Sequence, residues 1–187
     1  MAALVLHGPA VASPPGEGGD VIDFGKFELD TTDSHFVLYD DERAVSQRRA
    51  GSGNGNLDEC TPNQGPLPDG QYDGVATWHQ DKFAGTKIYG RVVRLQNKAC
   101  WDGQIRSDLF IHTEETPEQG QAPAGGRRDH DQRWDGNGDY KSQGCIKLSR
   151  AENGGDNGIS TLDSWWHEQA GGGVGTPYHG LLNVWWL

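Results

Sequence analysis

The chain has 187 residues, a length that fits one domain, and a formal net charge of −11 from 16 basic and 27 acidic side chains. Such a surface repels phosphate backbones, so nucleic acid is excluded as an expected partner, and no apolar run approaches the roughly 20 residues needed to cross a bilayer. Hydrophobic residues make up 34% of the chain and glycines number 28, so the core must sit among many glycine-rich loops.

The first 20 residues predict an N-terminal segment separate from the folded domain. Residues 1–13 are apolar and end in small residues, as the tail of a signal peptide does, but they lack its basic start. A signal-peptide remnant and a flexible arm are therefore both compatible with this stretch. Residues 8–20 are rich in Pro, Gly and Ser. We expect the domain itself to occupy residues 21–187.

The next segments predict a mainly β domain. Residues 35–39 and 44–49 predict the two strands of a hairpin, with the turn at residues 40–42. Residues 50–56 predict a glycine-rich loop, and residues 61–72 have the Pro and Gly chemistry of turns. Further strands are expected over residues 74–78, 88–95, 108–112 and 181–187.

One long connection and one helix complete the expected elements. Residues 114–140 carry little apolar content, which predicts an insertion rather than a core element. Ser160 and Asp163 resemble a helix capping box, and the glycines at 171–173 supply the stop. The expected architecture is a β-rich domain with one or two short helices.

Three cysteines are an odd count, which favours one disulfide and one free thiol. Cys60 and Cys100 both lie in loop-like contexts, so we expect them to pair, and the protein to occupy an oxidising, extracytoplasmic compartment. Three reduced thiols are the alternative. No Cys or His spacing is typical of a zinc site, and residues 135–139 imitate a calcium loop but lack its later Gly and Glu. We therefore expect neither a metal nor a cofactor.

The strongest chemical signal is the third cysteine, Cys145, which follows Gly144 in the segment SQGCIKL. A thiol becomes a nucleophile when an imidazole or backbone dipoles favour its thiolate, and glycine lets the backbone turn sharply. The amides of Gly144 and Cys145 are candidate donors to a tetrahedral oxyanion. His112 ends an apolar run and is the candidate base. A lone cysteine is more often a buried structural residue, so order and context have to decide.

These segments resemble the L,D-transpeptidase (YkuD-type) family, whose motif is a His on a strand, a loop, and then [Ser/Thr]-His-Gly-Cys. The matching segments are FIHT at 110–113, SQGCIKL at 142–148, FVLYD at 36–40, AGSG at 50–53 and LPDGQY at 67–72. The resemblance implies a β-sandwich or barrel fold with a long insertion before the catalytic Cys.

The same resemblance implies roles for the site residues. Cys145 would be the nucleophile and His112 its base, with the carbonyl of Thr113 orienting the imidazole. Ser142 would shape the turn, and Gly144 would belong to the catalytic loop. Residues expected to contact substrate are Lys147, Gln143 and Tyr140.

Two departures from the family pattern bear on activity. Gln143 stands where the common motif has His, although some members also lack this His. The segment between His112 and Ser142 is longer than usual, so we expect it to act as a lid that restricts the acyl acceptor.

The function implied by the resemblance is L,D-transpeptidation of bacterial peptidoglycan peptide stems through a Cys145 thioester. Hydrolysis of the same stems, as in an L,D-carboxypeptidase or a toxin-like effector, is the alternative. An inactive wall-binding module and a sortase-like enzyme are minor alternatives. The expected partners are the peptide stems, and the expected state is a monomer.

Overall fold

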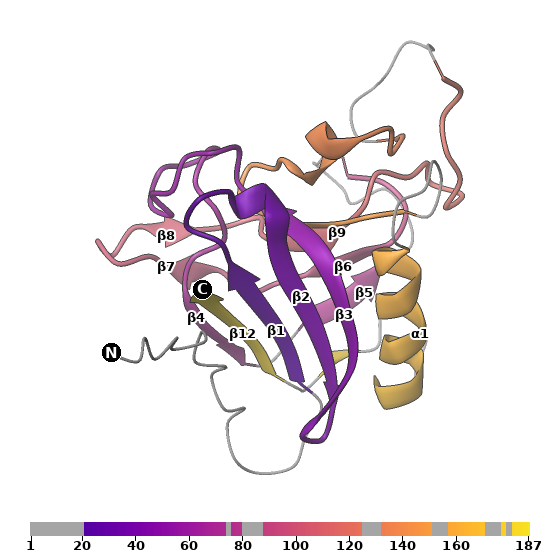
Figure 1. The fold of residues 1–187 in the computed structure, drawn as a ribbon, viewed down its shortest axis with the longest axis horizontal. Helices are drawn as coiled ribbons and strands as arrows, with labels where there is room; N and C mark the ends of the chain where they lie inside the picture. The colour runs from indigo at the N-terminus through magenta and orange to yellow at the C-terminus, as the bar shows by residue number, and fades with distance from the viewer. Residues whose placement is uncertain are drawn as a thin grey trace, which may run out of the picture.

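The structure is a computed structural model, which describes residues 21–73, 76–79, 88–124, 132–150, 157–170, 177–178 and 181–187. The N-terminal segment predicted over residues 1–20 lies outside these ranges. In the described part of the chain, ten strands form one curled sheet, two form a separate hairpin, and one α-helix stands beside the sheet (Figure 1). The prediction of a mainly β fold is confirmed.

The strand order of the large sheet brings segments from the whole chain together. In spatial order it is β11 (Pro177–Tyr178), β5 (Ala76–His79), β6 (Val92–Arg94), β9 (Phe110–His112), β10 (Ile146–Leu148), β3 (Arg43–Ser52), β2 (Ser34–Asp40), β1 (Val21–Lys26), β12 (Leu181–Trp186) and β4 (Gly70–Asp73). The pairs β1–β12 and β9–β10 are parallel. The separate hairpin is β7 (Lys98–Ala99) with β8 (Ile105–Arg106), and the helices are η1 (Thr31–Asp33), η2 (Asn137–Tyr140) and α1 (Gly158–Ala170).

The predicted hairpin forms as β2 and β3, but β3 continues to Ser52, into the segment predicted as a loop. Ala50, Gly51 and Ser52 pair with β10, so a partner far along the chain makes these small residues a strand. A Cβ atom on Gly51 would collide with the backbone carbonyl of Tyr140. Small residues are therefore needed here for close packing.

Two predicted elements have different boundaries. The strand predicted over residues 88–95 is confined to β6. Helix α1 begins at Gly158, so Ser160 and Asp163 lie inside it and form no capping box. Instead, Ser160 Oγ and Asp163 Oδ2 accept hydrogen bonds from Arg91 Nη1, at 2.9 and 3.2 Å. Ser160 and Asp163, which were predicted to cap the helix, therefore bind the side chain of Arg91, a residue distant in sequence.

The main core lies between the curled sheet and α1, which contacts β3 and β11 (Figure 1). Its largest buried side chains include Phe24, Phe36 and Trp166. Among the described residues, no helix has both the length and the apolar character needed to span a membrane.

The insertion predicted over residues 114–140 is described at 114–124 and 132–140. Contrary to the prediction, both described ends are packed into the domain. Glu115 is fully buried at one end, and Trp134 and Tyr140 are buried at the other, with their rings edge to face at 4.8 Å. These ends belong to the framework of the domain, and residues 125–131 between them lie outside the described ranges.

Candidate active site

His112 is the last residue of β9, and Cys145 immediately precedes β10, the parallel neighbour of β9. Strands β9 and β10 pair with Ile146 beside Ile111, and both isoleucines belong to the main core. Because side chains alternate along a strand, His112 and Phe110 lie on the face opposite Ile111. Cys145 packs against Phe110 in a second, smaller cluster. The strand register therefore brings the thiol and the imidazole to one face.

The imidazole of His112 is held by its neighbour. Nδ1 of His112 lies 3.1 Å from the carbonyl oxygen of Thr113. A carbonyl oxygen only accepts, so Nδ1 carries the proton of the neutral ring and Nε2 has the lone pair that a general base needs. Both residues are buried, which limits the ring's rotation. This is the contact that the family resemblance implies.

Ser142 closes the turn that precedes the thiol. Its hydroxyl donates to the carbonyl oxygen of Cys145 at 2.6 Å, and accepts from the N–H groups of Gly53 and Gly144 at 3.0 and 3.1 Å. Ser142 thus has the turn-shaping position expected of it. The Gly144 amide, however, is used inside the turn, so the expectation that it donates to an oxyanion is not supported by this geometry.

Arg106 is the main site residue that sequence reasoning missed. Its guanidinium presses against Gly144, which has φ +120°, and a Cβ atom at residue 144 would collide with Nη2. Nη2 lies 3.1 Å from the carbonyl of Gln143, and the other carbonyls that accept from the guanidinium are those of Glu59 and Gly65. Burial lowers the pKa of Arg106, but an arginine remains charged near neutrality. A positive charge is therefore fixed beside the cysteine loop.

A disulfide secures the position of this arginine. Cys60 and Cys100 are linked, with their Cα atoms 5.5 Å apart and a sequence separation of 40. Cys60 directly follows Glu59, whose carbonyl accepts from Arg106, and Cys100 lies in the β7–β8 hairpin that carries Arg106. The crosslink thus ties the arginine's strand to one of its acceptors. Cys145 is the free cysteine.

Of the three residues expected to contact substrate, one is exposed and two are buried. Gln143, two residues before Cys145 in the chain, is exposed, as a substrate contact would require. Lys147 is 2% exposed, and its Nζ lies 2.6 Å from Oε1 of Glu114, so it is neither a solvated residue nor presented to substrate. Tyr140 is also buried, with Arg49 stacked over its ring at 4.0 Å. The last two are corrected to framework residues, because distant partners cover them.

The thiol itself is recessed. Cys145 is 8% exposed and packs against Phe110, Val92 and Ile88. Its Sγ lies 3.8 Å from the carbonyl oxygen of Asp108, a residue with φ +55° at the entrance to β9. An apolar environment disfavours a charged sulfur, whereas the positive charge of Arg106, which interacts with Cys145, favours one. Burial and a neighbouring cation therefore act on the Cys145 sulfur in opposite directions.

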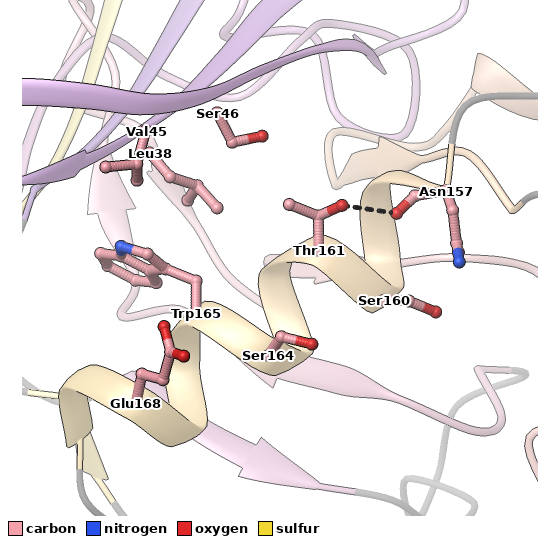
Figure 2. Close-up of a pocket in the computed structure, with 9 residues that line it drawn as sticks. All are labelled: Leu38, Val45, Ser46, Asn157, Ser160, Thr161, Ser164, Trp165 and Glu168. Carbon is pink, nitrogen blue, oxygen red and sulfur yellow. Dashed lines mark hydrogen bonds between the residues drawn. The ribbon is translucent and has the colours of Figure 1, made fainter.

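A separate groove of about 450 Å³ lies between α1 and the β2–β3 hairpin (Figure 2). Figure 2 shows Trp165 and Leu38 at one end of it and the hydroxyls of Ser160, Thr161 and Ser164 along the helix. The Thr161 hydroxyl is used within the helix, because it donates to the carbonyl of Asn157 at 3.0 Å. Neither Cys145 nor His112 lines this groove. The hollow is thus distinct from the candidate active site.

No protein-family model matches the chain, and no curated protein matches it. Among solved structures, an L,D-transpeptidase from Xylanimonas cellulosilytica is similar, with a TM-score of 0.42 and 17% sequence identity. The similarity covers 92% of this chain and 63% of the other. A likeness of this size assigns neither family nor activity to this chain.

Proposed function

We propose that this protein is a cysteine acyltransferase of the L,D-transpeptidase type, acting on the peptide stems of bacterial peptidoglycan. Cys145 is the nucleophile and His112 the general base. The observation that supports the proposal is that Cys145, just before β10, clusters with Phe110 on the face of β9 that also carries His112, together with the 3.1 Å contact between His112 Nδ1 and the Thr113 carbonyl. This contact leaves Nε2 as the proton acceptor.

The reaction proceeds in two steps. The Cys145 sulfur attacks the carbonyl carbon of a stem peptide bond, and His112 passes the thiol proton to the departing amine. The resulting thioester is opened by an amine of a second stem, which gives a cross-link, or by water, which gives hydrolysis. Since the Gly144 amide is occupied by Ser142, Arg106 is the fixed cationic group available to offset negative charge at this turn.

The disulfide supports an extracytoplasmic location for the proposed activity. Disulfides persist in oxidising surroundings, and the Cys60–Cys100 link supports a location outside the cytoplasm, where peptidoglycan is found. Site and compartment therefore favour the same substrate class.

The direct test is mass spectrometry of disaccharide-peptide stems incubated with the protein. We expect loss of the terminal stem residue with either cross-linked or hydrolysed products. Cys145→Ala should abolish turnover, and His112→Ala should reduce acylation by about 10²–10⁴-fold, the usual contribution of a general base. His35, which contacts Gln47 at 3.2 Å in the exposed part of β2, provides a matched control. Full turnover by the Cys145→Ala protein would refute the mechanism.

The recessed thiol favours a second candidate, a wall-binding module without catalysis. At 8% exposure Cys145 has little access to solvent, and a buried cysteine usually acts as a small hydrophobe. Iodoacetamide labelling of the native protein separates the two candidates. An active Cys145 should be alkylated near neutral pH, whereas a structural one should react only after unfolding.

A further inference from the structure

A lysine that the proposed reaction does not use lies fully buried at the end of β1. Lys26 is 0% exposed, and its Nζ lies 2.6 Å from Oδ1 of Asp69 and 3.3 Å from Oε2 of Glu59. The same nitrogen lies 2.8 Å from the carbonyl oxygen of Leu67 and 4.2 Å from the centre of the Trp186 ring. One amine, two carboxyl groups and an aromatic wall are thus gathered around one nitrogen atom.

This cluster holds two acidic groups and one basic group. If both carboxyl groups were ionised, a single ammonium would face two carboxylates inside the protein, which is costly because buried charges lose their hydration. Burial raises the pKa of Asp69, which favours its protonated form. Glu59 also accepts the backbone N–H of Asp69 at 2.9 Å, so its carboxylate bridges the amine and the aspartate.

We propose that Lys26 and Asp69 form an intramolecular isopeptide bond, with Glu59 as the proton carrier. The inference is independent of the peptidoglycan activity. The Lys26 nitrogen is already in contact with the Asp69 carboxyl group, which is the proximity that makes an intramolecular step fast. The leaving water has a way out, since the Asp69 side chain is 41% exposed although the Oδ1 atom is buried.

The reaction balances without any added reagent. Glu59 takes one proton from the Lys26 ammonium, and the neutral amine attacks Cγ of the protonated Asp69 carboxyl. A C–N bond forms, the C–O bond to the aspartate hydroxyl breaks, and this hydroxyl leaves as water with a second proton from the nitrogen, relayed by Glu59. The nitrogen keeps one hydrogen. Ammonium, protonated carboxyl and carboxylate thus become an amide, water and a protonated Glu59.

The amide would join two distant parts of the sheet. Lys26 is the last residue of β1, and Asp69 directly precedes β4, with β12 lying between these two strands. Trp186, which faces the ammonium, is paired with Lys26 in β12. The bond would therefore staple three strands at the edge of the sheet.

The test is the intact mass of the denatured protein after reduction and alkylation, followed by peptide mapping. We expect the wild-type protein to be one water molecule lighter than its sequence, with the Lys26 and Asp69 peptides recovered as one linked species. Because Asp69 precedes Gly70, a local succinimide would lose the same water. A mass deficit with the two peptides separate, or no deficit at all, would overturn the proposal, and this measurement needs no variant to fold.

Variants then identify the groups involved. Lys26→Arg keeps the positive charge without the nucleophile and should restore the full mass, as should Glu59→Gln if Glu59 carries the protons. Lys147→Arg alters a second buried lysine, which contacts Glu114, and should leave the deficit in place. Linked peptides in the Glu59→Gln protein would overturn the role of Glu59, and loss of the link in Lys147→Arg would overturn the assignment to Lys26.

Discussion

Two buried arginines show how one residue type takes two roles in this molecule. Arg91 and Arg106 are 6% and 5% exposed. Arg91 is paired with carboxylates, those of Glu115 at 2.5 Å and Asp163 at 3.2 Å. Arg106 donates to backbone carbonyls and, in the described part of the chain, forms no ion pair. Arg91 thus contacts carboxylates directly, whereas the direct acceptors of Arg106 are neutral backbone oxygens.

The pKa values of the two guanidinium groups reflect this difference. Burial on its own lowers the pKa of Arg91, but the hydrogen bonds and charges of Glu115 and Asp163 outweigh it and raise the pKa. Burial lowers the pKa of Arg106, and the nearby Cys145 opposes that shift. Arg91 therefore secures the framework between β6 and α1, and Arg106 positions the cysteine loop and supplies it with positive charge.

The largest effect on the free energy of unfolding is expected from removing Glu115, the carboxylate that pairs with Arg91. Glu115→Ala removes the fully buried carboxylate that Arg91 and Arg150 both contact. Breaking a buried ion pair in this way usually costs about 3–5 kcal/mol of unfolding free energy. Urea unfolding measures the change. The exposed Glu118 provides the control, and Glu118→Ala should change stability by no more than about 0.5 kcal/mol. Equal stability of both variants would contradict a structural role for the ion pairs of Arg91 with Glu115 and Asp163.

Removing the disulfide should have a slightly smaller effect on stability and a second effect on the site. The double variant Cys60→Ala, Cys100→Ala should lose about 3–4 kcal/mol in the chain-entropy description of a crosslink of this length. Because the link holds the hairpin of Arg106, we also expect slower alkylation of Cys145 in the folded variant. Unchanged alkylation would show that Arg106 stays in place without the crosslink.

Replacing Arg106 tests whether the positive charge of its guanidinium stabilises the Cys145 thiolate. In Arg106→Gln the midpoint of the pH profile for Cys145 alkylation should move to higher pH. The rate near neutral pH should fall about tenfold, which corresponds to about 1.4 kcal/mol of lost thiolate stabilisation. Arg106→Lys should recover part of the loss. Arg91→Gln is the matched control and should lower stability without moving the profile. A shifted profile in Arg91→Gln alone would reverse the two roles.

The smallest effect concerns a buried carboxylate with a neutral partner. Burial raises the pKa of Asp23 above 3.8, although Asn183 Nδ2 donates to it at 2.9 Å. A raised carboxyl pKa favours the folded state below the unfolded value, and this contribution is lost as the pH rises through the folded pKa. Asp23→Asn should therefore stabilise the protein at neutral pH by less than about 1 kcal/mol, with no gain below pH 3.8. Urea unfolding at both pH values checks the sign.

Much of the candidate site could be predicted because its contacts are local. The bond from His112 reaches the next residue, and Ser142 bonds within the turn that ends at Cys145. The Gly-Cys sequence and the apolar strand before His112 are visible in a short window. The prediction that the Gly144 amide donates to an oxyanion is not supported. The motif alone does not reveal that this amide donates to the Ser142 hydroxyl instead.

The sequence by itself determined the β-rich class, the β2–β3 hairpin, and the order of the candidate base and nucleophile, because alternation and turn chemistry operate over a few residues. The tertiary structure alone decided the roles of Arg106, Lys147 and Lys26. Each is a charged side chain that propensity assigns to the surface, yet each is buried by partners at least 33 positions away in the chain. A buried charge is identified by what surrounds it, and those surroundings exist only once the strands have paired.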